Sequence, residues 1–265
     1  MRLKDKVIIV TGSTMGIGKA IAKKVVSEGA KVIIHGLEED LGIQVVSELG
    51  AEHAKLHIED ISNEGAGQRL VDLAIATWGR LDCIVNNAAV VAASTLLSTD
   101  KAFLNRILDV NTIAPLFLIK SALPHLIESH GAVLNIGSIN AWSGEHNLLA
   151  YSISKGALMT MTRNLGDSLF RENGVRVNQI NPGWVLTEKE IERKKEHGLS
   201  DNWYKDLSKL YAPAGRIIWP EEIAAATIYW LSDESGPISG QVVDLEQFPM
   251  IGRNIPKDAS TIPHK

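Results

Sequence analysis

Short apolar runs alternate along this chain with longer amphipathic stretches. The runs are rich in Val, Ile, Leu and Ala and predict strands, which we expect at residues 7–10, 31–34, 54–58, 81–86, 132–137, 175–180 and 241–245. Helical periodicity fills the intervals, at 16–28 and 38–49 and most clearly over 101–128, 150–171 and 221–232. Because the strand runs are apolar throughout, helices should cover both faces of the sheet. The pattern predicts an α/β protein with one doubly wound parallel sheet of about seven strands.

Two segments depart from this alternation. Residues 184–212 are charged and aromatic, and at this length they predict a lid or substrate loop, with a solvated surface excursion as the alternative. Residues 246–265 contain three prolines and are expected to form an extended C-terminal tail. The expected organisation is therefore one domain over residues 1–245, including the loop at about 184–212, followed by the tail.

Composition narrows the classes of protein that the chain can belong to. Its 265 residues suit one α/β domain, and 27 Lys and Arg against 31 Asp and Glu, with no long run of one sign, disfavour a nucleic-acid partner. No apolar stretch of about 20 residues predicts a membrane span, and the charged N-terminus does not resemble a signal peptide, so we expect a cytoplasmic protein. The single Cys83 excludes an internal disulfide, and neither Cys nor His spacing indicates a metal site.

A glycine-rich turn follows the first predicted strand and opens into a helix. Gly12 allows a sharp turn, Gly16 lets the backbone approach a pyrophosphate, and Gly18 permits close helix–strand packing. The helix N-terminus would present free N–H groups to the phosphates. The spacing, without a following Gly-Lys-Ser/Thr, is not that of a nucleoside-triphosphate loop. The turn predicts a dinucleotide site made by Gly12, Ser13, Thr14, Met15, Gly16, Ile17 and Gly18.

The end of the second predicted strand bears on the choice between NAD and NADP. An acid here binds the ribose 2′-hydroxyl of NAD, whereas a basic residue suits the 2′-phosphate of NADP. Gly36 and Leu37 follow the strand and are succeeded by Glu38, with no Lys or Arg in this turn. We expect Leu37 and Glu38 to contact the cofactor and NAD to be favoured. NADP is not excluded, because the first position after the strand is Gly36 rather than an acid.

A tyrosine and a lysine one helical turn apart are the candidate acid–base pair. Tyr151 and Lys155 share a helix face, and Ser138 lies just after a predicted strand, at the ligand-facing edge of the sheet. A phenol with a pKa of ~10 needs stabilisation of its anion, which the Lys155 cation and a helix N-terminus would supply. Ser138 can hydrogen-bond the substrate oxygen while Tyr151 exchanges its proton. In the alternative reading, Tyr151 caps a core helix and Lys155 is its solvated partner.

The ordered series of motifs resembles the short-chain dehydrogenase/reductase family over about residues 6–245. The motifs that carry the resemblance are Thr11-Gly12-x-x-x-Gly16-Ile17-Gly18, Asp60, Asn86-Asn87-Ala88-Ala89, Asn111, Ser138, Tyr151-x-x-x-Lys155 and Asn181-Pro182-Gly183-x-x-x-Thr187. The resemblance implies a Rossmann-like fold and hydride transfer between a nicotinamide cofactor and a secondary alcohol or ketone. The chain departs from the family at Ala89, which replaces a glycine, and at residues 243–246, which lack a glycine pair.

The resemblance also implies roles for individual residues. Asn111 would anchor a water in a proton relay that leads from Tyr151 and Lys155 to solvent. It implies a homodimer or homotetramer, with the helices at 101–128 and 150–171 in the interfaces. Contacts to the adenine, the cofactor cleft, the nicotinamide and the phosphates would come from Asp60, Ile61, Asn87, Ala88, Ala89, Tyr151, Lys155, Pro182, Gly183, Val185 and Thr187.

Polar and aromatic residues near the candidate chemistry indicate the kind of substrate. Asn140, Trp142 and His146 precede Tyr151, and Trp184 follows Gly183. Such a mixture suits a small polar molecule such as a sugar or polyol, with aromatic faces against its C–H surfaces. Two other functions stay open at this point. One is a non-catalytic dinucleotide-binding sensor or scaffold, and the other is an epimerase or dehydratase with a tightly held cofactor.

Overall fold

Seven parallel strands form one sheet in the computed structural model, which describes residues 1–196, 198–210 and 212–249. The strand order is β3-β2-β1-β4-β5-β6-β7. The strands are β1 (Val7–Val10), β2 (Lys31–Gly36), β3 (Ala54–Ile58), β4 (Cys83–Asn86), β5 (Ala132–Ile136), β6 (Arg176–Pro182) and β7 (Val242–Leu245). The predicted α/β fold with a seven-stranded parallel sheet is confirmed. The first or last residues of several strands differ from the prediction by one or two positions.

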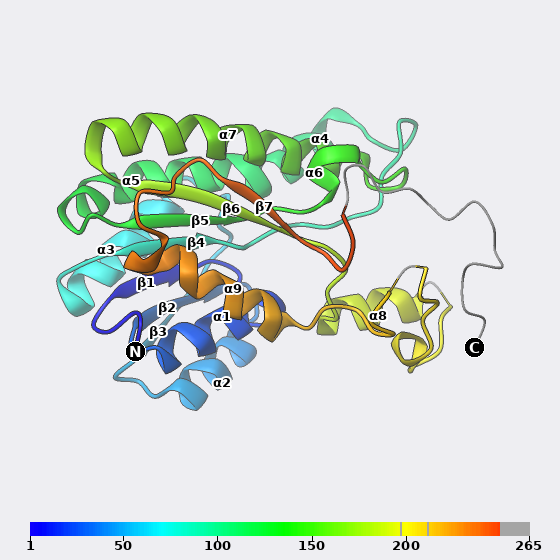
Figure 1. The fold of residues 1–265 in the computed structure, drawn as a ribbon, viewed down its shortest axis with the longest axis horizontal. Helices are drawn as coiled ribbons and strands as arrows, with labels where there is room; N and C mark the ends of the chain where they lie inside the picture. Colours follow the sequence, from blue (N-terminus) through cyan, green and yellow to red (C-terminus); the bar gives the residue numbers. More distant parts are fainter. Residues whose placement is uncertain (197, 211, 250–265) are drawn as a thin grey trace.

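Helices cover both faces of the sheet (Figure 1). On one face lie α1 (Gly16–Ser27), α2 (Glu39–Leu49) and α9 (Pro220–Leu231). On the other lie α3 (Ala66–Trp78), α5 (Ala114–Glu128) and α7 (Leu149–Asn173). The remaining helical elements are α4 (Lys101–Leu108), the π-helical η1 (Asp109–Ile113), α6 (Asn140–Ser143), α8 (Glu188–Glu196), η2 (Trp203–Lys205) and η3 (Asp233–Ser235).

The apolar strand runs are explained by the two cores that the sheet separates. Successive side chains of a strand point to opposite faces. Accordingly Ile8 and Val10 pack into the core beneath α1 and α9, whereas Val7 and Ile9 pack into the core beneath α3 and α5. All four are buried, so β1 has no polar face.

The predicted helix over residues 101–128 is one helical stretch with a change of winding in its middle. It runs from α4 through the π-helical turn η1 into α5. By length and composition Lys101–Glu128 is apolar enough to cross a membrane, a weak test that core helices also pass. One of its faces is buried, through Leu118, Ala122 and Leu126, in the core against α3. Single π turns inside α-helices often mark functional sites.

The described part of residues 184–212 contains a helix that the sequence analysis did not predict, while the expected role as a lid stays a prediction. Residues 188–196 form α8, and Figure 1 shows this helix beyond the end of the sheet. The helix has acids in its first turn and bases in its last, and Glu190 pairs with Arg193 and Lys194 at i,i+3 and i,i+4. Such charge placement stabilises a helix without an apolar stripe. Periodicity of apolar residues therefore gave no signal for it.

The predicted tail lies mostly outside the described residues. Residues 246–249 are described, and the prediction for residues 250–265 is neither supported nor contradicted. Glu246 turns back onto the body of the protein, because its Oε2 accepts a hydrogen bond from the Trp184 N–H group at 3.1 Å. Gln247 likewise donates from Nε2 to the Arg216 carbonyl at 2.7 Å.

One buried carboxylate links the start of β1 to the start of β4 and leads to a stability prediction. Asp82 is 1% exposed, accepts a hydrogen bond from the Val7 N–H group at 2.8 Å, and pairs with Arg80 at 2.6 Å. Asp82→Ala leaves the buried Val7 N–H group without a partner. We expect the free energy of unfolding to fall by about 2 kcal/mol in denaturant titration. Asp167→Ala, which breaks an exposed i,i+4 pair with Arg171, should change it by less than about 0.5 kcal/mol. Equal effects of the two substitutions would contradict this account.

Candidate active site

The glycine-rich turn between β1 and α1 has the close packing that its sequence predicts. Gly12 and Gly16 have φ values of +63° and +54°, which other residues rarely adopt. A Cβ atom on Gly12 would lie 2.8 Å from the Ala88 Cα atom, and one on Gly18 would lie 2.1 Å from the Gly12 carbonyl oxygen. Asn87 fixes the turn from the β4 side, because its Nδ2 donates to the Gly12 carbonyl at 2.9 Å. The turn is therefore packed so closely that neither Gly12 nor Gly18 can carry a side chain.

A histidine that the sequence analysis did not single out positions this turn. The Gly12 N–H group donates to Nδ1 of His35, at 3.2 Å. The imidazole is 2% exposed, and its burial lowers the pKa of His35 to about 4. It is therefore neutral near pH 7, as an acceptor at Nδ1 must be. The contact joins β2 to the turn after β1, and no local sequence motif predicts such a pairing.

The acid expected near the cofactor ribose reaches back to the glycine-rich turn. Glu38 Oε2 accepts a hydrogen bond from Thr14 Oγ1 at 2.8 Å. A Cβ atom on Gly36 would lie 2.6 Å from that same Thr14 side chain. The Thr14 side chain thus occupies the space in which an acid at position 36 would begin. This contact explains why the acidic group comes two residues later, from Glu38.

The first two residues of α8 also contact the glycine-rich turn and the acid that follows β2. Glu188 Oε2 accepts a hydrogen bond from the Gly16 N–H group at 3.1 Å. Lys189 Nζ lies 3.0 Å from Glu38 Oε1. A carboxylate on the Gly16 amide shows that this turn accommodates an anionic oxygen, so the donor set fits the pyrophosphate of a dinucleotide. Sequence reasoning missed both α8 residues, because 150 or more positions separate them from their partners.

Asp60, which the family resemblance assigns to the adenine, is held by a neighbouring arginine. Its Oδ2 atom lies 2.6 Å from Arg106 Nη2 of α4, and its Oδ1 accepts from the Ser62 N–H group at 2.9 Å. The Arg106 hydrogen bond, with help from Ser62, lowers the pKa of Asp60 to about 2. Ile61 beside it is buried in the core beneath α3. Their contact with a cofactor stays a prediction.

Ser138, Tyr151 and Lys155 meet at the carboxyl end of β5. Ser138 follows β5, and its N–H group donates to Asn181 Oδ1 at 3.1 Å, which ties it to β6. Tyr151 and Lys155 lie in the first turns of α7, and Ser138 lies close enough to the Tyr151 phenol to lower its pKa against the effect of burial. Lys155 Nζ is 5.6 Å from the centre of the Tyr151 ring and donates to the Ile136 carbonyl at 2.7 Å. The three side chains predicted from spacing thus form one group.

Burial sets the charge of this group. Desolvation raises the pKa of Tyr151 to about 12, although the Ser138 hydrogen bond and the Arg193 charge act in the opposite direction. Desolvation also lowers the pKa of Lys155 to about 7. Both shifts favour the neutral form of a buried group. Tyr151 is therefore protonated near neutral pH, and a positive charge beside it would favour its anion.

Asn111 lies in the π-helical turn η1 and ties it to two neighbours. Its Oδ1 accepts from the Val90 N–H group at 2.8 Å, and its Nδ2 donates to the Val90 carbonyl and to Ser154 Oγ, both at 3.0 Å. Asn111 therefore fixes the segment after β4 against α7, three residues from Tyr151. Its participation in a proton relay stays a prediction.

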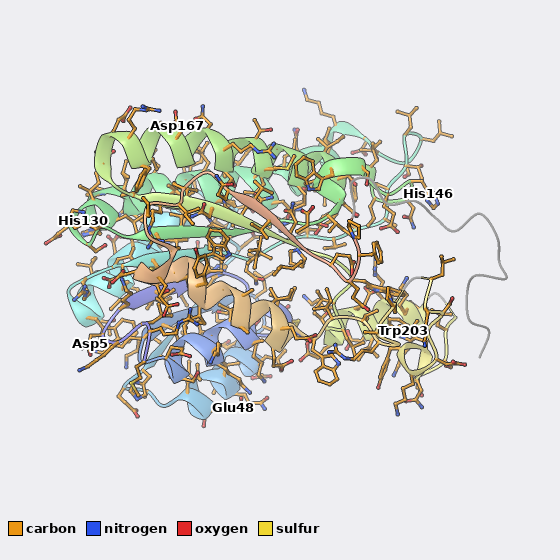
Figure 2. All side chains as sticks on the ribbon, viewed as in Figure 1. Asp5, Glu48, His130, His146, Asp167 and Trp203 are labelled. Atoms are coloured by element: carbon orange, nitrogen blue, oxygen red, sulfur yellow. The ribbon has the colours of Figure 1, made fainter. Side chains whose placement is uncertain are left out.

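A cleft of about 630 Å³ contains Ser138, Tyr151 and Lys155. Its lining includes the predicted residues Ile17, Asn87, Ala89, Ser138, Asn140, Tyr151, Lys155, Pro182, Gly183, Trp184, Val185 and Thr187. Trp142 and His146 are not among the lining residues. Trp142 is turned toward β7, where its Nε1 donates to Asp244 Oδ1 at 2.8 Å and Arg163 stacks on its ring. His146 is exposed, and Figure 2 shows it at the same end of the molecule as Trp203.

Charged residues also line the cleft, and sequence reasoning missed four of them. The four are Glu190, Arg193, Lys194 and Glu246, and the fifth is Glu145, which lies in the segment between Asn140 and Tyr151. Glu190 is 9% exposed and accepts hydrogen bonds from Trp184 Nε1 at 2.7 Å and Arg193 Nε at 2.9 Å. Trp184 in turn stacks on Trp203, with ring centres 5.2 Å apart. This pair of a buried carboxylate and a half-exposed guanidinium, with the Trp184 hydrogen bond, makes α8 a defined wall of the cleft. Within the described ranges, no three Cys, His, Asp or Glu residues are grouped to hold a metal ion.

Comparison with known proteins agrees with this geometry. The family model described as enoyl-(acyl carrier protein) reductase matches residues 12–246. Glucose 1-dehydrogenase 2 of Bacillus subtilis is 33% identical over 90% of this chain and 92% of its own length. L-fucose dehydrogenase of Mus musculus is 35% identical over 88% and 84%, and the NADP-dependent (R)-specific alcohol dehydrogenase of Lentilactobacillus kefiri is 32% identical over 88% and 92%. On its motifs, its fold and these matches, the chain belongs to the short-chain dehydrogenase/reductase family.

Proposed function

We propose that this protein is an NAD(P)-dependent oxidoreductase that transfers a hydride between a nicotinamide cofactor and a secondary alcohol or its ketone. The observation that carries the proposal is the Ser138–Tyr151–Lys155 group in a cleft that adjoins the glycine-rich turn. Membership of the family and its named dehydrogenases supports the same reaction class. The bound nicotinamide would supply the hydride acceptor or donor, and the protein would supply binding and proton transfer.

The protein's own groups divide the proton chemistry between them. Ser138 donates a hydrogen bond to the substrate oxygen and holds it beside the Tyr151 hydroxyl. Tyr151 takes the hydroxyl proton of an alcohol, or gives a proton to the oxygen of a ketone. Lys155, one turn along α7, stabilises the phenolate by its charge and loses that effect when it is neutral. Asn111 fixes η1 against α7 and so keeps this geometry.

NAD is the cofactor we propose as favoured. Glu38 places its carboxylate on Thr14, within the turn that would bind the pyrophosphate, where it can accept a hydrogen bond from a ribose 2′-hydroxyl. The same negative charge would oppose a 2′-phosphate. One relative is named an NADP-dependent alcohol dehydrogenase, so the family includes members that use NADP.

The substrate we propose is a small polar molecule of the sugar or polyol class. Asn140, Glu145, Glu190 and Arg193 offer hydrogen-bond donors and acceptors around Tyr151, and Trp184 offers an aromatic face. Relatives named for glucose, L-fucose and meso-2,3-butanediol support this class. The segment 184–212 would act as the substrate lid, since α8 forms one wall of the cleft.

We also propose a cytoplasmic homodimer or homotetramer built as one domain over residues 1–245. The support is an apolar surface on the helices predicted for the interfaces. Ile113, Leu116 and Phe117 on η1 and α5, and Ile153 on α7, are 39–54% exposed. Exposed apolar side chains gathered on neighbouring helices are typical of protein interfaces.

A fluorescence titration with NADH and NADPH tests the proposal first. Micromolar binding of NADH and weaker binding of NADPH would support the reaction class and the role of Glu38, and NAD⁺ turnover would then be screened with sugars and polyols. Tighter binding of NADPH would contradict the proposed cofactor. Binding of neither would favour the non-catalytic sensor or scaffold. Conversion of a substrate without net cofactor change would identify an epimerase or dehydratase.

A further inference from the structure

Lys189 of α8 lies beside Glu38, the acid that would bind the cofactor ribose. Lys189 Nζ and Glu38 Oε1 are 3.0 Å apart, although the two residues are 151 positions apart in the chain. The Lys189 side chain is 66% exposed and that of Glu38 is 33% exposed, so both can reach a ligand at the surface of the turn. The sequence of the turn after β2 supplies acidic residues and no Lys or Arg. In the folded protein, Lys189 adds a positive charge beside Glu38.

The two charges have opposite consequences for the two cofactors. Glu38 can accept a hydrogen bond from a 2′-hydroxyl, and it repels a 2′-phosphate. Lys189 can donate to a 2′-phosphate as a point charge, and it also partly neutralises Glu38. Thr14 Oγ1 holds Glu38 Oε2 at 2.8 Å, so the carboxylate stays at the turn while Lys189 is the freer partner. A phosphate at this position would therefore meet one fixed negative charge and one adaptable positive charge.

We propose that Lys189 is a specificity-determining residue for the 2′ position of the cofactor, and that it supplies the cation for a 2′-phosphate that the turn after β2 lacks. This inference rests on the proposed nicotinamide-cofactor function. It implies that the protein discriminates against NADPH less strongly than it would if Glu38 were present without Lys189. It also implies that each member of the pair shifts the preference in its own direction.

Three variants separate these effects. Lys189→Met leaves Glu38 unopposed, and the ratio of the NADPH Kd to the NADH Kd should rise about tenfold. Glu38→Gln leaves Lys189 free, and the same ratio should fall about tenfold, through tighter NADPH binding. Lys189→Arg retains the positive charge and should keep the ratio near that of the unmodified protein. The matched control is Lys195→Met on the same helix, because Lys195 pairs with Asp201 instead.

Adenosine fragments provide a readout that does not depend on turnover. Isothermal titration of the full chain with adenosine 5′-monophosphate and with adenosine 2′,5′-bisphosphate compares ligands that differ in the 2′-phosphate. Lys189→Met should weaken binding of the bisphosphate selectively, and added salt should reduce the difference between the two proteins. If Lys189 serves only to hold α8 in place, its loss will change the affinities for both fragments equally.

The outcomes distinguish this inference from the function on which it rests. Failure of the unmodified protein to bind NADH and NADPH would overturn both. Binding of at least one dinucleotide, with an unchanged ratio in Lys189→Met, would overturn the role of Lys189 and leave the proposed function intact. A ratio that rises in Lys189→Met, falls in Glu38→Gln and is unchanged in Lys195→Met would establish the inference.

Discussion

Tyr151→Phe should lower kcat by about 10³-fold and leave the Kd for the nicotinamide cofactor nearly unchanged. The substitution removes the hydroxyl that we propose to exchange the substrate proton, while the ring keeps its place in α7. General acid–base catalysis contributes about 10²- to 10⁴-fold to rate, so loss of the group should be of this size. Steady-state kinetics with the best substrate of the screen measures kcat, and fluorescence titration measures the Kd.

The control for this prediction removes an equivalent hydroxyl far from the cleft. Tyr229 lies on α9 and packs edge to face on Trp230, outside the residues that line the cleft. Tyr229→Phe should retain full activity. Retention of full activity by Tyr151→Phe would show that another group transfers the proton. A loss of cofactor binding equal to the loss of turnover would show that Tyr151 acts mainly in binding.

Lys155→Met should abolish most turnover and, at the same time, stabilise the protein. The ammonium group is 3% exposed, and burial lowers the pKa of Lys155 from 10.5 to about 7. Without its charge near Tyr151, the phenol is a weaker acid, and kcat should fall by about 10²-fold. Because a buried ammonium destabilises the folded state, its removal should raise the free energy of unfolding by about 2 kcal/mol at pH 7.

The pH dependence of that stabilisation follows from the direction of the pKa shift. Between pH 7 and 10.5 the unfolded chain holds a proton on Lys155 that the folded chain has lost, so stability from this group rises with pH. The advantage of Lys155→Met should therefore be largest at or below pH 7 and decline toward pH 10. Denaturant unfolding at pH 6.5, 8 and 9 tests this, below the range in which Tyr151 titrates. Stability from Tyr151, whose folded pKa is raised, is lost only as the pH rises from 10 to about 12.

An exposed lysine provides the reference for both measurements. Lys4 is exposed near the N-terminus, and Lys4→Met should change neither kcat nor the pH dependence of unfolding. A Lys155→Met protein that is less stable than the unmodified protein at every pH would contradict the account of the buried ammonium. Unchanged kcat would contradict its effect on Tyr151.

The sequence by itself determined the architecture and which residues form the Ser138–Tyr151–Lys155 group. Continuous apolar runs such as 7–10 predicted strands covered on both faces, because buried side chains on both sides of a sheet must be apolar. Gly12 and Gly18 predicted the cofactor turn, since a Cβ atom at either position would clash with backbone. Ser138, Tyr151 and Lys155 could be predicted because each lies at a strand end or on one helix face, where local geometry fixes direction.

Only the tertiary structure decided which distant residues complete the site. His35 meets the glycine-rich turn, Lys189 meets Glu38, and Glu190 with Arg193 forms a wall of the cleft. These contacts depend on how a helix without an apolar stripe lies against the end of the sheet. Trp142 shows the converse, since it is near Tyr151 in sequence and yet turns to Asp244. Hydrophobic periodicity specifies which face of an element is buried, but not which polar side chains meet across a cleft that water can also fill.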